Sequence, residues 1–154
     1  MAGNNDPVYS KVGDIQSTTL AAATLLGPTA NTAQDGTGTM YPVFTADATN
    51  GGYLQRLLFE SITSTALTVC RVFWSDTVPT VTSGALVSNT SLNTRKINEI
   101  QLPAVTVSQT AAAPHLELPI NMAIPPGHRI SVTFGTSTGA GTTGWAVTAV
   151  GGKY

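Results

Sequence analysis

The sequence predicts an all-β domain, an antiparallel β-sandwich of jelly-roll type with an extended N-terminal arm. Apolar and polar residues alternate with period two in several segments after residue 40, which is typical of half-buried strands. Clusters of Gly, Pro, Asn and Ser separate these segments, and none keeps a helical period over three capped turns. Two antiparallel sheets packed face to face would bury the apolar sides of so many short strands.

The arm is predicted to cover residues 1–39, and the sandwich or jelly-roll domain residues 40–154. The arm shows little alternation, and its apolar side chains would be exposed in an isolated chain. We therefore expect it to become ordered against a partner, although a frayed terminus is the simpler alternative. The arm residues expected to contact that partner are Tyr9, Ile15, Leu20, Leu25 and Leu26.

Seven strands are predicted from the alternation, and two weaker ones are placed near residues 85–88 and 106–109. Turn-forming residues around Gly51 and Gly127 separate two pairs of neighbouring segments. The seven predicted strands cover residues 41–46, 53–62, 67–75, 97–102, 115–120, 129–134 and 145–150.

The segment 129–134 illustrates how the two faces of a strand are assigned. Successive side chains of a strand point to opposite faces of its sheet. We therefore expect Ile130, Val132 and Phe134 to point into the core, and Ser131 and Thr133 to point outward.

The composition excludes several classes of protein. The chain of 154 residues carries seven basic and eight acidic residues, 10% of its length, whereas about a quarter is typical. So few cations cannot make a broad contact with phosphates, so nucleic acid is not an expected partner. No apolar run approaches the roughly 18 residues that span a bilayer, so no membrane contact is expected. The first residues lack the features of a secretory signal, and we expect synthesis in the cytoplasm.

Two motifs near the end of the chain match enzymatic patterns. Residues 135–139 fit G-x-S-x-G, and residues 139–144 fit G-x-G-x-x-G. Both patterns need a helix immediately after the turn, whereas the next predicted element is a strand. We therefore predict no catalytic residue and no enzyme, while a hydrolase that uses Ser137 in a triad assembled in space stays open as an alternative.

The remaining reactive side chains suggest packing rather than chemistry. Cys70, the single cysteine, lies in an apolar run and is predicted to be a buried, inert thiol. His115 and His128 have no second ligand at metal-binding spacing, so neither a metal nor a cofactor is expected. Trp74 and Trp145 lie among apolar neighbours, which favours packing over a sugar-stacking role.

Six short motifs carry a resemblance to a known family. They are Gly52-Tyr53-Leu54-Gln55-Arg56-Leu57, Arg71-Val72-Phe73, Ile100-Gln101-Leu102-Pro103-Ala104, Leu116-Glu117-Leu118-Pro119, Ala123-Ile124-Pro125-Pro126-Gly127-His128-Arg129 and the ending from Gly144 to Tyr154. Through them, about two thirds of the chain resembles the decoration, or cement, proteins of phage heads. These motifs describe turns and strands, not a catalytic signature, and the arm lies outside them.

The resemblance implies a function, a location and two partners. Decoration proteins of this type are jelly-roll trimers that bind the outer surface of the head and hold neighbouring major capsid subunits together. By this resemblance, the chain would be a structural virion protein made in the host cytoplasm, with the major capsid protein and two further copies of itself as partners. The alternative is a carbohydrate- or receptor-binding jelly-roll module of a phage tail or fibre.

Overall fold

The computed structural model describes residues 12–17, 29–82, 84–137 and 144–154, and within them the predicted all-β fold is confirmed. These residues form ten strands and no helix, so none of their segments is a helix that could span a bilayer. The strands are β1 (Val12–Ser17), β2 (Tyr41–Thr45), β3 (Gly52–Ser61), β4 (Thr68–Ser75), β5 (Thr80–Thr82), β6 (Ala85–Val87), β7 (Thr94–Leu102), β8 (Leu116–Ile124), β9 (Arg129–Phe134) and β10 (Trp145–Lys153).

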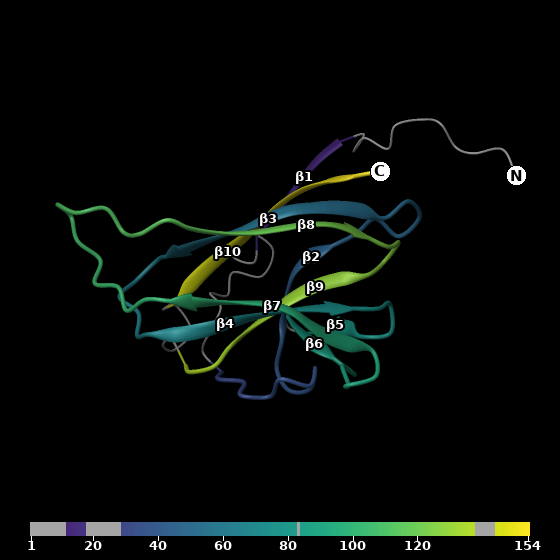
Figure 1. Ribbon diagram of the computed structural model, residues 1–154, viewed down its shortest axis with the longest axis horizontal. Helices are drawn as coiled ribbons and strands as arrows, with labels where there is room; N and C mark the ends of the chain where they lie inside the picture. The colour runs from purple at the N-terminus through teal and green to yellow at the C-terminus, as the bar shows by residue number, and fades with distance from the viewer. Residues whose placement is uncertain (1–11, 18–28, 83, 138–143) are drawn as a thin grey trace, which may run out of the picture.

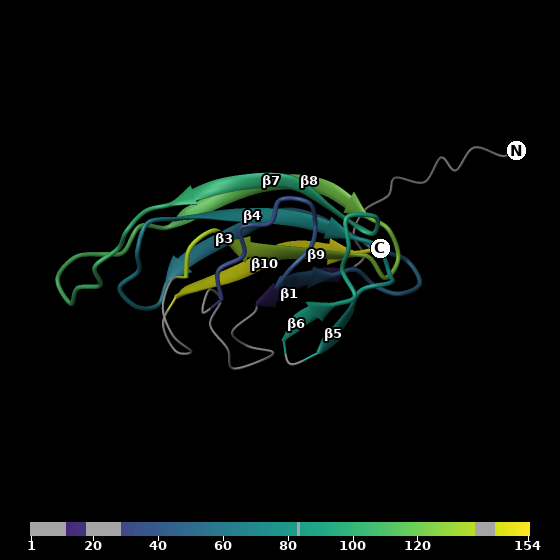
Figure 2. The ribbon, with the colours of Figure 1, turned by 90° about the horizontal axis from the view of Figure 1, so that it is seen from below.

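Eight of the strands form two four-stranded antiparallel sheets that pack face to face (Figure 1). Sheet A has the order β1-β10-β3-β8, and sheet B has the order β2-β9-β4-β7. Strands β5 and β6 form a separate hairpin at one end of the sandwich (Figure 2). The weaker strand expected near residues 85–88 is present as β6, whereas residues 106–109 belong to the loop between β7 and β8.

The core lies between the two sheets and follows the predicted alternation. Ile130, Val132 and Phe134 of β9 are fully buried there, as expected. They face the opposite sheet, whose inward residues include Leu57 and Trp145, the latter also fully buried. The alternation therefore assigned the inward side of β9 correctly.

The outward side of β9 differs from expectation, because Ser131 and Thr133 are fully buried as well. A third layer covers this face of sheet B, formed by the β5–β6 hairpin and by residues 29–40, which we call the strap. Met40 of the strap and Leu86 of β6 form a buried cluster with Phe73 of β4. The Leu86 amide also donates a hydrogen bond to the Met40 carbonyl over 2.8 Å.

Asn31 fixes the strap in place. Its side-chain amide donates to the carbonyls of Thr37 and Thr39 over 2.9 and 3.0 Å, and its side-chain oxygen accepts a bond of 2.9 Å from the Ala33 amide. Its own backbone amide bonds the Phe134 carbonyl of β9 over 2.8 Å. Residues 29–39, predicted to belong to the arm, thus pack on the sandwich.

A second part of the predicted arm also lies in the sandwich, because β1 is the edge strand of sheet A. It pairs along its whole length with β10. The side chain of Gln16 then reaches across to sheet B, where its amide donates to the Thr45 carbonyl and its oxygen accepts from the Thr45 amide, at 2.9 and 2.8 Å. Gln16 therefore joins the two sheets along this side of the sandwich.

Two predicted turns have the backbone geometry that glycine permits. Gly51 and Gly127 adopt φ values of 82° and 72°, in the left-handed region. Asp47 connects the two turns, because its carbonyl accepts bonds from both glycine amides, at 3.1 and 3.0 Å. Its carboxylate accepts bonds from the amides of Thr49 and Asn50, both at 2.9 Å.

Candidate interaction surfaces

The single thiol of the chain is enclosed, as predicted. Cys70 is fully buried between the sheets, and this burial raises the pKa of its thiol well above the ordinary value. A buried thiol of raised pKa is a poor nucleophile, because the thiolate is the reactive form.

The two enzymatic motifs cannot be placed in full, because residues 138–143 lie outside the described residues and carry two of the five positions of the first motif and five of the six of the second. Within the part of the chain that the structure describes, no three His, Cys, Asp or Glu side chains come close enough to hold a metal ion. His115 lies 3.7 Å from Glu60 in an exposed pair, and His128 stacks on the half-buried ring of Trp74 with centroids 5.1 Å apart.

The charged strand residues form ion pairs between neighbouring strands. Arg56 and Glu60 both lie on β3, but Arg56 contacts Glu117 of the neighbouring strand β8 at 3.8 Å. Arg71 of β4 lies 3.9 Å from Glu99 of β7. These pairs follow the register of adjacent strands, which the sequence alone does not give.

The outer face of sheet A forms the first candidate surface. No described strand packs on it, and most of its side chains are exposed or half-buried. Ile15 is 69% exposed and lies opposite the half-buried Val150 of β10. The next strands of the sheet add Leu58 and Pro119 to this face. This surface is partly apolar, and two of its charged groups neutralise each other in the Arg56–Glu117 pair.

Of the five arm residues expected to contact a partner, the structure places one. Ile15 lies on β1, at the edge of this open face. Tyr9, Leu20, Leu25 and Leu26 lie outside the described residues. Val12, at the start of β1, is also exposed, but its side chain lies on the opposite face of the strand from Ile15.

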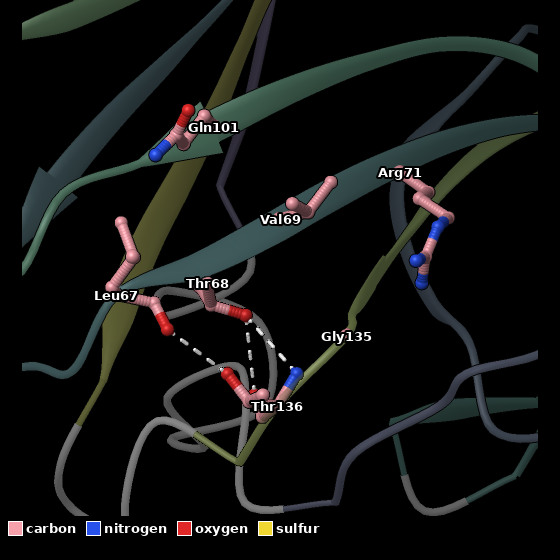
Figure 3. Close-up of a pocket in the computed structure, with 7 residues that line it drawn as sticks. All are labelled: Leu67, Thr68, Val69, Arg71, Gln101, Gly135 and Thr136. Carbon is pink, nitrogen blue, oxygen red and sulfur yellow. Dashed lines mark hydrogen bonds between the residues drawn. The ribbon is translucent and has the colours of Figure 1, made fainter.

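A groove of about 300 Å³ on the outer side of sheet B forms the second candidate surface (Figure 3). It lies where β4 begins and where β7 and β9 end. The strap ends beside it, since Arg71 donates a hydrogen bond of 3.2 Å to the Asn31 carbonyl. We call this the sheet B groove; its walls include Leu67, Val69, Arg71, Gln101, Gly135 and Thr136.

The loop of residues 88–93 forms the third candidate surface, and we call it the Leu92 loop. It follows β6 and leads into β7, at the end of the molecule where the β5–β6 hairpin lies (Figures 1 and 2). Leu92 is 88% exposed, more than any other large hydrophobic side chain among the described residues. Val78 and Val81 add further exposed apolar area in this part of the chain.

Sequence reasoning missed the groove and the Leu92 loop. The groove combines residues from three distant segments, and only the pairing of β4 with β7 and β9 brings them together. Leu92 stands alone among polar neighbours, so no periodic pattern marks it. The available signal was an isolated large apolar residue in a stretch rich in Asn, Ser and Thr, which is typical of a loop.

Comparison with known proteins adds no assignment. No family model matches this chain, and no match was found among curated proteins or among solved structures.

Proposed function

We propose that this chain is a structural virion protein that decorates the outer surface of a phage head and strengthens contacts between major capsid subunits. The sequence motifs that resemble decoration proteins are one source of support. The strand order is another, because β1 pairs with β10, β2 with β9, β3 with β8 and β4 with β7. We propose that this nested pairing is a jelly-roll topology.

The observation that carries the proposal is the contrast between the outer faces of the two sheets. The strap and the β5–β6 hairpin cover the outer face of sheet B over β9 and part of β4, whereas sheet A presents Ile15, Val150 and Leu58 on an open face. An apolar surface with few free charges, surrounded by polar residues, is typical of a site where another protein binds. In this proposal, the open face of sheet A lies against the capsid.

Many copies bound to one shell would make this attachment strong even if each contact were weak. A head presents the same site many times, so a protein that bridges two capsid subunits gains from effective concentration. Such a protein needs a rigid body and an exposed surface rather than a catalytic centre. The sandwich provides such a body, since Gln16 links its two sheets along one side.

The test is co-sedimentation of the purified chain with phage heads from which accessory proteins have been stripped. The wild type should bind with a saturable number of copies and should raise the temperature at which the heads break. Ile15→Asp should weaken binding about 10- to 100-fold, because burying an isoleucine is worth about 1.5–3 kcal/mol.

Val107→Asp is the matched control for that variant. Val107 is also exposed and apolar, but it lies in the loop between β7 and β8, away from the open face. Its substitution should leave binding to heads unchanged. Failure of the wild type to sediment with heads would overturn the proposed function, and equal binding by Ile15→Asp would overturn the assignment of the face.

A glycan-binding module of a tail or fibre is the second candidate, and one observation favours it. Tyr53 is half-buried on β3, and its hydroxyl donates to the side-chain oxygen of Asn121, 3.1 Å away, on β8. An aromatic ring beside an amide is a common platform for a sugar. Saturable binding on a glycan array that Tyr53→Ala abolishes would support this function over attachment to a capsid.

A further inference from the structure

The sheet B groove contains a largely buried cation. The side chain of Arg71 is 14% exposed, and its guanidinium forms part of the groove wall. Its Nη1 donates a hydrogen bond of 3.2 Å to the Asn31 carbonyl, whereas its Nε is buried and has no hydrogen-bond partner among the described residues. A charged group that is removed from water normally forms several hydrogen bonds, so Arg71 has donors left for a further acceptor.

The carboxylate that faces this guanidinium is shared with a second cation. Glu99 of β7 lies 3.9 Å from Arg71, beyond hydrogen-bond distance, and closer to Lys96, at 3.2 Å. Its side chain is also 53% exposed, so water weakens its attraction to both cations. Two positive charges thus stand against one negative charge at this wall, which favours an anionic ligand in the groove.

Gly135 leaves space beside the guanidinium. It is not among the glycines of positive φ, so a residue with a side chain could adopt its backbone conformation. A Cβ at this position would lie 3.4 and 3.6 Å from Nη1 and Nη2 of Arg71 (Figure 3). The role of the glycine is therefore to keep the groove open next to both terminal nitrogens.

The rest of the groove combines fixed polar groups with apolar walls. The Thr136 amide donates to the Thr68 hydroxyl over 3.1 Å, and the Thr136 hydroxyl donates to the Leu67 carbonyl over 3.2 Å (Figure 3). The side chains of Leu67 and Val69 provide apolar contact. The volume of about 300 Å³ lies at the lower end of the range for ligand sites, so the groove suits a small molecule.

From these features, we infer that the sheet B groove binds a small carboxylate that carries a short apolar chain. The carboxylate accepts hydrogen bonds from Arg71, because the planar donors of a guanidinium match the two oxygens of a carboxylate. The apolar chain lies against Leu67 and Val69. This site goes beyond the proposed function, and it is separate from the open face of sheet A.

The test is an NMR titration of the isotope-labelled full chain with butyrate, at constant pH and ionic strength. Butyrate should shift the backbone amide signals of Gly135 and Thr136 in a saturable way. Butyramide has the same chain but no charge, so it should bind about 10- to 100-fold more weakly through the loss of charge-assisted hydrogen bonds. Inorganic phosphate, an anion without an apolar chain, should also bind more weakly than butyrate.

Two variants remove different parts of the site. Arg71→Gln removes the charge, and Gly135→Ala fills the space beside the guanidinium, so each should weaken butyrate binding by about 10-fold or more. Gly135→Ala keeps every charge and adds only ordinary van der Waals contacts, so its thermal unfolding should match that of the wild type. Arg95→Gln is the matched control, because Arg95 is an exposed cation near the start of β7, whereas the groove meets β7 at its end.

Several results would overturn the inference. They are the absence of a saturable shift at Gly135 and Thr136, binding of butyramide or phosphate as tight as that of butyrate, unchanged binding by Gly135→Ala, and equal weakening by Arg95→Gln and Arg71→Gln. The proposed function is tested by sedimentation with heads, so either proposal can fail without the other.

Discussion

Replacing Asn31 by alanine should separate the strap from sheet B and lower the stability of the whole domain. The substitution removes three hydrogen bonds, two donated to carbonyls of the strap and one accepted from the Ala33 amide. Asn31 is only 5% exposed, so water cannot readily replace these bonds. At about 1 kcal/mol for each bond, the free energy of unfolding should fall by about 3 kcal/mol.

Urea unfolding followed by tryptophan fluorescence measures this loss, because Trp145 is fully buried in the folded state. Asn89→Ala is the matched control. It also removes two hydrogen bonds to strap carbonyls, but Asn89 is less enclosed, so we expect a smaller loss of about 1 kcal/mol. If Asn31→Ala cost less than its control, the view of Asn31 as the residue that fixes the strap would be refuted.

Three further predictions follow from the geometry. Gly151→Ala should lower the free energy of unfolding by about 3 kcal/mol, because the new Cβ would clash with the Tyr53 carbonyl oxygen. Gly13→Ala is the control: its Cβ would meet no atom within 4 Å, so its free energy of unfolding in the same urea assay should be nearly that of the wild type. Cys70 should react with a thiol reagent only after unfolding, because burial raises the pKa of its thiol; labelling of the native protein would contradict this. The backbone amides of Asn50 and Thr49 hold the pKa of the Asp47 carboxyl below its ordinary value, so its contribution to stability should be full above that ordinary value and be lost as the pH falls through the lowered pKa. Urea unfolding of the wild type and of Asp47→Asn over a range of pH measures this loss, and a stability difference that does not change with pH would contradict it.

The sequence predicted the sandwich well because period-two alternation reports directly on which side of a strand is buried. In β8 the alternation continues through Met122 to Ile124, beyond the predicted end at residue 120. It failed for Ser131 and Thr133, because alternation distinguishes two faces but does not show whether a third layer covers the outer one. Their small hydroxyl side chains fit beneath such a layer, yet they are equally common on solvated faces.

The strap and β1 were harder to predict than the strands of the core. Residues 29–40 lack alternation because they are held by the side chain of Asn31 and by loop hydrogen bonds rather than by a regular ladder. The six residues of β1 alternate weakly, since this edge strand is open on one face and covered only in part on the other. The sequence did single out Ile15 as a contact residue, and that function stays a prediction.

The position of β10 has a consequence for how the protein folds. β10 is the last strand in the described chain, yet it lies inside sheet A, between β1 and β3. During synthesis, β1 and β3 leave the ribosome early but have no common neighbour until β10 emerges. Because contacts between distant segments form slowly, sheet A should close late, and a nascent chain should expose its unpaired strand edges for most of translation.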